Sequence, residues 1–325
     1  MQTVHEIPDR MTALRLHRPG DPAGLVVERV ETPRPGEGEV LVRVHAAAIT
    51  RDELEWPADR LPAVPSYEFS GVVAAAGPGV DWLAPGDEVF GLSPFDRDGA
   101  AADYLSLPAR LLAPKPKRLD HIHSAAIPLA ALSAWQGLFV HGRLESGQRV
   151  CIHGASGGVG SYAVQFAHRC GAYVIGTASP QNLSLVRELG ADEAVGCPGE
   201  DLEKTVGSVD LVFDTAGGER LKQSVHLVRP GGRLVSVAVE PDVEAAAERG
   251  IEAIYFVVEP NAAQLRGISR LADEGELRSL VAEVYALDRA REAFERSLHA
   301  RPAGKIVLQI AGQQRQPVDR FTLQG

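Results

Sequence analysis

The sequence is poor in cysteine. Its three cysteines, Cys151, Cys170 and Cys197, lie 19 and 27 positions apart, and no Cys-x-x-Cys pair is present. This spacing fits neither a disulfide framework nor a thiolate zinc site. We interpret all three as small core residues and expect a reducing, cytoplasmic compartment.

Excess positive charge and long apolar runs are also lacking. The chain has 33 Lys and Arg against 43 Asp and Glu, a net charge of −10, and its basic residues are scattered. A nucleic-acid-binding protein would concentrate positive charge on one face. No uninterrupted apolar run reaches the ~18 residues that a membrane helix needs. We therefore expect neither nucleic acid nor a membrane as a partner.

What the sequence does contain is typical of a folded globular chain. Its 325 residues correspond to two domains at roughly 150 residues each. Apolar residues make up 45%, and there are 33 glycines and 22 prolines. This composition indicates folded, turn-rich domains and excludes disorder as the main state.

The first third of the chain has the pattern of a barrel-like β domain. Short alternating or apolar runs, separated by Pro-Gly pairs, predict strands at residues 11–16, 25–30, 40–46, 71–76 and 88–90. Asp120 then precedes a largely apolar helical stretch over residues 121–140, which Pro128 should kink or split.

From Arg149 the pattern changes to strands alternating with helices, which predicts a parallel sheet with right-handed crossovers. The expected strands are residues 149–153, 173–177, 193–195, 210–214, 233–239 and 251–258, and the expected helices are residues 159–169, 183–189 and 220–228. Two more helices (262–275 and 290–298), a strand (305–310) and a loose polar tail (313–325) complete the prediction.

A glycine-rich loop lies between the first of these strands and the first helix. The residues from Gly154 to Gly160 can be read as A-x-G-x-x-G, with Ala155 at the tight turn, Gly157 at the close approach to a pyrophosphate and Gly160 at the helix-on-strand contact. The backbone N–H groups around Ser156, Gly158 and Val159 would then face an anion at the start of a helix. The strand before and the helix after the loop favour a dinucleotide site over a turn without a ligand.

The end of the second strand of this sheet distinguishes NADP from NAD. A carboxylate there would bind the ribose 2′-hydroxyl of NAD, but residues 173–182 contain no acid. Thr177, Ser179 and Asn182 could instead donate to the 2′-phosphate of NADP, which we therefore favour. The immediate loop has no Arg or Lys, and Arg187 on the following helix is the nearest cation.

These motifs together resemble the zinc-independent, quinone oxidoreductase-like branch of the medium-chain dehydrogenase/reductase superfamily. The segments that carry the resemblance are residues 36–42, 68–73, 85–89, 154–160, 213–218 and 304–308. The resemblance implies an α/β fold in which a doubly wound Rossmann domain (131–258) is inserted in a GroES-like β-barrel catalytic domain (1–130 and 259–325). It also implies a homo-oligomer, with a homodimer as the first choice.

The resemblance extends to further cofactor contacts. It places Thr215, Ala216 and Gly217 after the fourth strand, Ala238 and Val239 after the fifth, and Phe256 and Val257 after the sixth. Lys305 resembles a lysine that often lies near the cofactor, although a solvated strand-end charge is an equal alternative.

Zinc is not expected. Thr50 and Tyr67 occupy the places of zinc ligands in zinc-dependent relatives, and neither is a plausible ligand. Tyr67 is the first candidate to bind the substrate oxygen or supply a proton, with a purely shape-defining aromatic as the alternative. Thr50 and Ser133 are candidates for positioning. Glu68 is expected to be structural, paired with a cation or with backbone N–H groups.

The leading hypothesis is an NADPH-dependent reductase of small-molecule quinones or α,β-unsaturated carbonyl compounds. Two alternatives stay open: a biosynthetic reductase of enoyl thioesters, and a cofactor-binding protein with little turnover.

Overall fold

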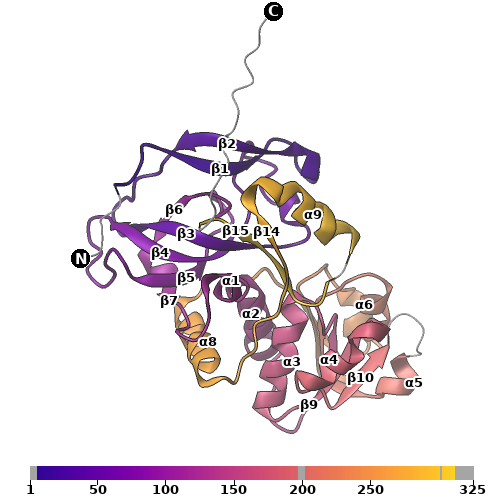
Figure 1. Cartoon of the computed structure of the whole chain (residues 1–325). Coiled ribbons are helices and arrows are strands. Elements are labelled where there is room, and N and C mark those ends of the chain that lie inside the picture. Colours follow the sequence, from indigo (N-terminus) through magenta and orange to yellow (C-terminus); the bar gives the residue numbers. More distant parts are fainter. Residues whose placement is uncertain (1–5, 197–201, 301, 312–325) are drawn as a thin grey trace, which may run out of the picture.

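The computed structural model describes residues 6–196, 202–300 and 302–311. In these residues the strands form three sheets, with two, six and seven strands. The two-stranded sheet is an antiparallel pair at the N-terminus, β1 (Arg10–Leu16) and β2 (Leu25–Glu31). Figure 1 shows this pair and the seven-stranded sheet on one side of the molecule, and the six-stranded sheet on the other.

The seven-stranded sheet joins strands from both ends of the chain. Its order is β14-β15-β3-β4-β5-β7, and β6 also pairs with β3. Antiparallel pairing of β15 with β3 sets Ile306 opposite Ile49, and this register brings Lys305 close to Thr50. The strands are β3 (Glu39–Ile49), β4 (Glu68–Ala76), β5 (Glu88–Leu92), β6 (Tyr104–Pro108), β7 (Leu112–Pro114), β14 (Val281–Ala286) and β15 (Lys305–Gln309).

The six-stranded sheet has the predicted doubly wound form. Its order is β10-β9-β8-β11-β12-β13, and all of its pairs are parallel. The strand order reverses between β8 and β11, which is where such sheets bind ligands at their carboxyl edge. The strands are β8 (Arg149–His153), β9 (Tyr173–Ala178), β10 (Glu193–Gly196), β11 (Val209–Asp214), β12 (Val228–Ser236) and β13 (Glu252–Tyr255).

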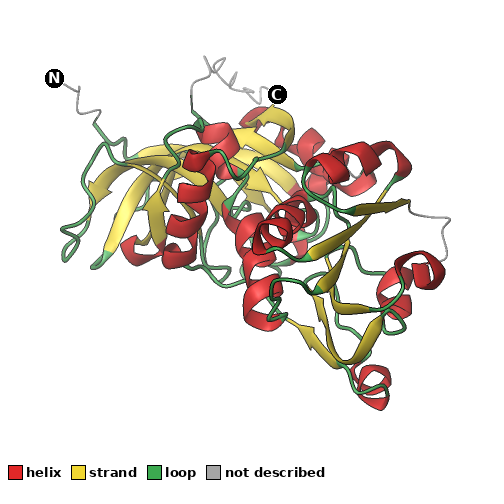
Figure 2. Ribbon diagram, turned by 90° about the horizontal axis from the view of Figure 1, so that it is seen from below, coloured by secondary structure: helices red, strands yellow, loops and turns green. Residues whose placement is uncertain are grey.

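Nine α-helices lie in the described residues, and Figure 2 shows helices packed along the parallel sheet. They are α1 (His121–Ala125), α2 (Pro128–Trp135), α3 (Gly158–Cys170), α4 (Leu183–Glu188), α5 (Leu202–Val206), α6 (Glu219–Ser224), α7 (Val243–Glu248), α8 (Ala262–Glu274) and α9 (Ala290–His299). None of these helices combines the length and the apolar character that a bilayer crossing requires.

Local chemistry explains the break near Pro128. The Asp120 carboxylate accepts a hydrogen bond from the His123 N–H at 2.8 Å and so caps α1. Helix α1 ends at Ala125, and Pro128 opens α2, where its missing N–H costs nothing. The predicted split is therefore confirmed.

The predicted helix over residues 220–228 was too long. Helix α6 ends at Ser224, and Val228 begins β12, where it pairs with Val209. Strands β6, β7 and β14 were missed. Two of them are short and end in proline, which weakens the sequence pattern of a strand.

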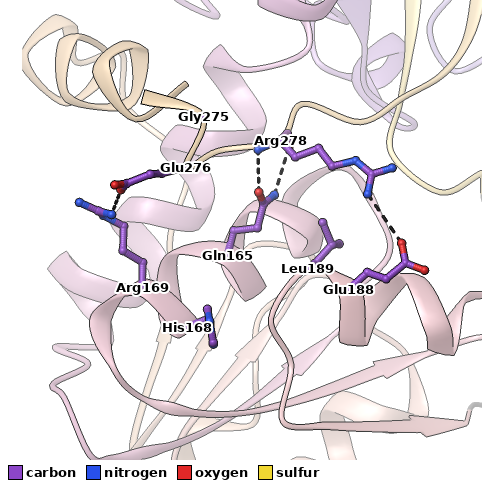
Figure 3. A pocket seen from close by; sticks show the side chains of 8 residues that line it. All are labelled: Gln165, His168, Arg169, Glu188, Leu189, Gly275, Glu276 and Arg278. Atoms are coloured by element: carbon purple, nitrogen blue, oxygen red, sulfur yellow. Dashed lines mark hydrogen bonds and ion pairs between the residues drawn. The ribbon is translucent and has the colours of Figure 1, made fainter. Parts of the chain in front are cut away.

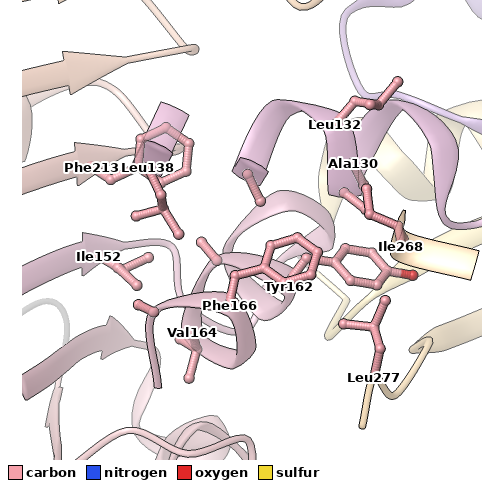
Figure 4. Close-up of a cluster of buried hydrophobic side chains, with 14 of the residues drawn as sticks. Ala130, Leu132, Leu138, Ile152, Tyr162, Val164, Phe166, Phe213, Ile268 and Leu277 are labelled. Atoms are coloured by element: carbon pink, nitrogen blue, oxygen red, sulfur yellow. The ribbon is translucent and has the colours of Figure 1, made fainter. Parts of the chain in front are cut away.

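The largest core cluster fills the space between the parallel sheet and helices α2, α3 and α8. Figure 4 shows Tyr162 and Phe166 of α3 between Ile152 of β8 and Ile268 of α8. The buried Tyr162 hydroxyl donates to the Ala126 carbonyl at 3.1 Å, which attaches α3 to the chain just before α2. The helix that follows the glycine loop is thus packed into the core along its length.

Cys151 is fully buried, as expected of a small core residue, whereas Cys170 is only partly buried. Cys197 and the predicted tail lie outside the described residues.

Candidate active site

The glycine loop forms a tight connection from β8 into α3. Gly154 has φ +70°, so the left-handed turn lies there and not at Ala155, where the sequence reading placed it. Ala155 is fully buried instead. A Cβ on Gly160 would lie 2.1 Å from the Gly154 carbonyl oxygen, so only glycine lets the helix approach the turn this closely. Gly157 is less crowded, since its Cβ would meet only that carbonyl oxygen, at 3.2 Å.

Three of the predicted cofactor residues form a polar cluster beside this loop. The Asn182 side-chain amide donates to the hydroxyl oxygens of Ser156 and Ser179, at 3.2 and 3.1 Å. Because both hydroxyls accept from this amide, their own protons are free to donate to an anion.

Thr177 does not join that cluster. It is 2% exposed, and its hydroxyl lies 3.0 Å from Nδ1 of the buried His153. The imidazole Nε2 is in turn 2.7 Å from the Ser224 hydroxyl. The expected use of the Thr177 hydroxyl as a phosphate donor does not fit this position, because that hydroxyl is engaged inside the domain.

The ends of β11 and β12 are tied together at the same edge of the sheet. The buried Asp214 carboxylate accepts hydrogen bonds from the Gly217 N–H at 3.1 Å, from the Ala216 N–H at 3.3 Å and from the Ser236 hydroxyl at 3.0 Å. The Thr215 hydroxyl donates to the His153 carbonyl at 2.7 Å. These bonds fix the loop over residues 215–217 at the point where the sheet order reverses.

The remaining predicted contacts differ in exposure. Ala238 and Val239 donate from their N–H groups to the Ser236 hydroxyl oxygen, and the Val239 side chain is 49% exposed. Phe256 is buried with its ring 4.3 Å from that of His141, whereas Val257 is 59% exposed.

Ser133 is 3% exposed and donates its hydroxyl proton to the Leu129 carbonyl at 2.8 Å, within α2. Its oxygen can still accept a hydrogen bond, but its proton is not available to a ligand.

Lys305 connects the glycine loop to Glu68 and Thr50. Its stem lies against Gly158, where an added Cβ would come within 2.6 Å of Lys305 Cδ. Its ammonium group lies 2.6 Å from the Glu68 carboxylate and donates to the Thr50 hydroxyl at 3.1 Å. Lys305 is only 7% exposed, so the alternative of a solvated strand-end charge is wrong.

Glu68 has the structural role that was expected. It is fully buried, one carboxylate oxygen pairs with Lys305, and the other accepts from the Leu129 N–H at 2.9 Å, near the start of α2. The carboxylate therefore satisfies a free N–H of a helix N-terminus and links β4, α2 and β15.

Glu53 is a further buried carboxyl group, and the sequence analysis missed it. It accepts hydrogen bonds from the Thr50 N–H at 3.0 Å and the Ser66 N–H at 3.2 Å. Burial raises the pKa of Glu53 to about 8, against the lowering effect of Lys305. No local pattern marked it, because Glu53 lies among the charged residues Arg51, Asp52 and Glu55.

The titration of Glu53 gives a testable pH dependence. Because its pKa is raised on folding, the folded chain binds more protons than the unfolded chain between about pH 5 and pH 8, and stability from this group falls as pH rises. We expect the Tm difference between Glu53→Gln and the wild type to shift in favour of the variant from pH 5 to pH 8. Thermal melts at intervals of one pH unit measure it.

The exposed neighbour Glu55 provides the control, since a Glu55→Gln variant should keep a constant Tm difference over the same range. A constant difference for Glu53→Gln as well would show that Glu53 ionises normally.

Tyr67 is more enclosed than the sequence suggested. It is fully buried, with ring centroids 5.7 Å from Trp56 and 5.2 Å from Phe95, and its hydroxyl accepts from Arg60 at 2.8 Å. Burial raises the pKa of Tyr67 to about 12, although the Arg60 charge lowers it. A direct contact of this hydroxyl with a substrate would require the aromatic neighbours to move.

A charged surface pocket lies elsewhere, at the far end of α3 from the glycine loop. Figure 3 shows its lining, in which Arg278 pairs with Glu188 at 3.8 Å and Arg169 pairs with Glu276. This pocket lies at the C-terminal end of α3, whereas the glycine loop lies at its N-terminal end. The two are therefore separate sites.

Within residues 6–196, 202–300 and 302–311, no group of three or more His, Cys, Asp or Glu side chains is placed to hold a metal ion. His121 and His123 have separate partners: His121 lies 2.8 Å from the Ser70 hydroxyl, and His123 bonds to Asp120.

Two family models match the chain. The model described as an alcohol dehydrogenase GroES-like domain matches residues 36–117, and the model described as a zinc-binding dehydrogenase matches residues 189–308.

Similar proteins extend over nearly the whole chain. A probable zinc-binding mitochondrial oxidoreductase of Arthroderma benhamiae is 33% identical, over 95% of this chain and 100% of that protein. An NADPH-dependent chloroplastic alkenal/one oxidoreductase of Arabidopsis thaliana is 31% identical, over 89% of this chain and 77% of that protein. The solved structure of a quinone oxidoreductase from Coxiella burnetii superposes with a TM-score of 0.87 at 29% identity, over 93% of this chain and 99% of that one.

Proposed function

Because the chain belongs to the quinone oxidoreductase-like branch of the medium-chain dehydrogenase/reductase superfamily, we propose that it reduces quinones or α,β-unsaturated carbonyl compounds with NADPH and without zinc. The observation that carries this proposal is the position of Lys305. The Lys305 side chain packs against Gly158, the first residue of α3, and its ammonium group donates to the Thr50 hydroxyl.

The residues of the glycine loop fit a dinucleotide. Gly157 leaves room for a pyrophosphate, and the first N–H groups of α3 would bind it, together with the positive end of the helix. Ser156, Ser179 and Asn182 would hold the adenosine ribose and its 2′-phosphate. The bound cofactor would supply the hydride.

Thr50 is the best-placed donor to a substrate oxygen. Its hydroxyl oxygen accepts a hydrogen bond from Lys305, so the proton of the hydroxyl itself can point to a ligand. Thr50 is partly exposed, whereas Lys305 and Glu68 beneath it are buried. A donor fixed in this way stabilises the negative charge that develops on a carbonyl oxygen during reduction.

The same residues argue against a zinc centre. Zinc prefers thiolate, imidazole and carboxylate ligands, and Thr50 and Tyr67 offer an alcohol and a phenol that is bonded to Arg60. In this proposal Tyr67 does not act on the substrate. It forms a buried wall of the site, and its hydroxyl is held by Arg60. Solvent can then supply the proton for the product.

A spectrophotometric screen tests the function. NADPH and NADH are each offered with quinones, enones and enoyl thioesters, before and after treatment with a chelator. We expect NADPH oxidation with a quinone or an enone, unchanged by the chelator. Loss of activity with the chelator would contradict the zinc-free reaction, and turnover of enoyl thioesters alone would favour the biosynthetic alternative.

A further inference from the structure

At the carboxyl edge of the parallel sheet, one guanidinium nitrogen of Arg220 has no hydrogen-bond partner among the described residues. Arg220 lies in the first turn of α6, directly after the loop that follows β11. Its Nη1 atom is buried and has no hydrogen-bond partner among the described residues. The acid beside it, Glu219, is paired with Lys222 at 2.6 Å. A buried guanidinium nitrogen without a partner is costly, so a ligand that supplies the acceptor absent from the described residues would bind here favourably.

A chain of hydrogen bonds connects the backbone of Arg220 to the end of β9. The Ser224 hydroxyl donates to the Arg220 carbonyl at 2.6 Å and lies 2.7 Å from His153 Nε2. The other imidazole nitrogen is 3.0 Å from the hydroxyl of Thr177, the penultimate residue of β9. Burial, together with the Arg220 charge, lowers the pKa of His153 to about 4, which fits a cation close to this histidine.

The end of the second strand of a doubly wound sheet is where such folds distinguish the two nicotinamide dinucleotides. Two hydroxyl donors lie at that position, because Ser179 follows β9 directly and the hydroxyls of Ser179 and Ser156 both accept from the Asn182 amide, which leaves their own protons to donate. A phosphate there would meet two neutral donors and the guanidinium nitrogen that has no partner among the described residues.

We propose that Arg220 binds the 2′-phosphate of NADP(H) and sets the preference for NADP(H) over NAD(H). This inference rests on the proposed function. Arg220 takes the place of Arg187, which the sequence analysis gave as the nearest cation. The Arg187 guanidinium donates instead to the Ala194 carbonyl at 3.3 Å. Arg187 is in the last turn of α4, which runs back toward the amino edge of the sheet, away from a ligand at the carboxyl edge.

Binding measurements with fragments of the cofactor test this assignment without turnover. The dissociation constants of 2′,5′-ADP, 5′-AMP, NADPH and NADH are measured by calorimetry for the wild type and for Arg220→Met, which keeps an unbranched apolar stem. We expect the variant to bind 2′,5′-ADP and NADPH about 10- to 100-fold more weakly, the range of a lost charge-assisted contact. Binding of 5′-AMP and NADH should stay within about twofold, since these ligands lack the phosphate.

Three controls separate charge from structure. Arg220→Lys should recover part of the affinity for 2′,5′-ADP, because it restores the positive charge but not the fork geometry. Arg187→Met should leave all four constants unchanged. The ligand-free Arg220→Met protein should melt no lower than the wild type, since the substitution removes a buried group without a partner.

Equal weakening of 2′,5′-ADP and 5′-AMP in Arg220→Met, or an unchanged ratio between them, would overturn the assignment. If Arg220→Met does not fold, Arg220→Gln gives the same comparison with a polar side chain. A wild type that binds neither dinucleotide would refute the proposed function, whereas a wild type that binds NADH as well as NADPH would refute only the role of Arg220.

Discussion

Replacing Lys305 by methionine should lower the free energy of unfolding by about 3–5 kcal/mol, the usual effect of breaking a buried ion pair. The substitution leaves the carboxylate of Glu68 fully buried without its cation, 2.6 Å from where the ammonium was. It also removes the positive charge that lowers the pKa of Glu53, so burial raises that pKa without opposition from Lys305. Equilibrium unfolding in urea at pH 7, followed by circular dichroism, measures the change.

A double variant distinguishes this electrostatic effect from lost packing. Lys305→Met combined with Glu68→Gln should recover a large part of the loss, because removing both partners of a buried pair is far less costly than removing one. Lys222→Met, which breaks the exposed pair with Glu219, should change stability little. A double variant as unstable as Lys305→Met would place the cost in packing against Gly158.

The parts of the fold that depend on neighbouring residues could be predicted from the sequence. The strand before the glycine loop, the helix after it and the break at Pro128 each follow from residues within one or two turns of the chain. The parallel order of the six-stranded sheet was predicted because alternating strands and helices allow few connections.

The chemistry of the site depends on register between distant strands, which the sequence does not display. Lys305 meets Thr50 across 255 positions because β15 pairs with β3, and a shift of one residue would turn its side chain to the other face. The same limit explains Thr177. A threonine hydroxyl could serve as a phosphate donor, but packing decides which face of β9 the side chain occupies. On the face that it occupies, the Thr177 hydroxyl meets His153 of the neighbouring strand β8.

The burial of Tyr67 was likewise not visible in the sequence. The place of Tyr67 in the chain indicated a cleft residue, and the fold encloses it between Trp56 and Phe95. Glu68 was predicted correctly because a carboxylate near a cleft commonly belongs to a structural ion pair, and this expectation does not depend on register.

Thr50→Val should reduce kcat about 100- to 1,000-fold, the range found when one donor to a developing oxyanion is removed. Valine keeps the shape of threonine and removes only the hydroxyl that Lys305 polarises, while Lys305 keeps Glu68 as its partner. Steady-state kinetics with the best quinone or enone from the screen, at saturating NADPH, measure the loss. Thr50→Ser should keep most of the activity because it keeps the hydroxyl.

The comparison with Tyr67→Phe decides which hydroxyl acts on the substrate oxygen. The Tyr67 hydroxyl is covered and bonded to Arg60, so its removal should cost less than about tenfold, whereas Thr50→Val should cost far more. If Tyr67→Phe causes the larger loss, the two roles are reversed. The loss in Thr50→Val should fall on kcat and leave KM nearly unchanged, because the carbonyl oxygen gains its negative charge only in the transition state. A rise in KM alone would mean that Thr50 binds the substrate without taking part in its reduction.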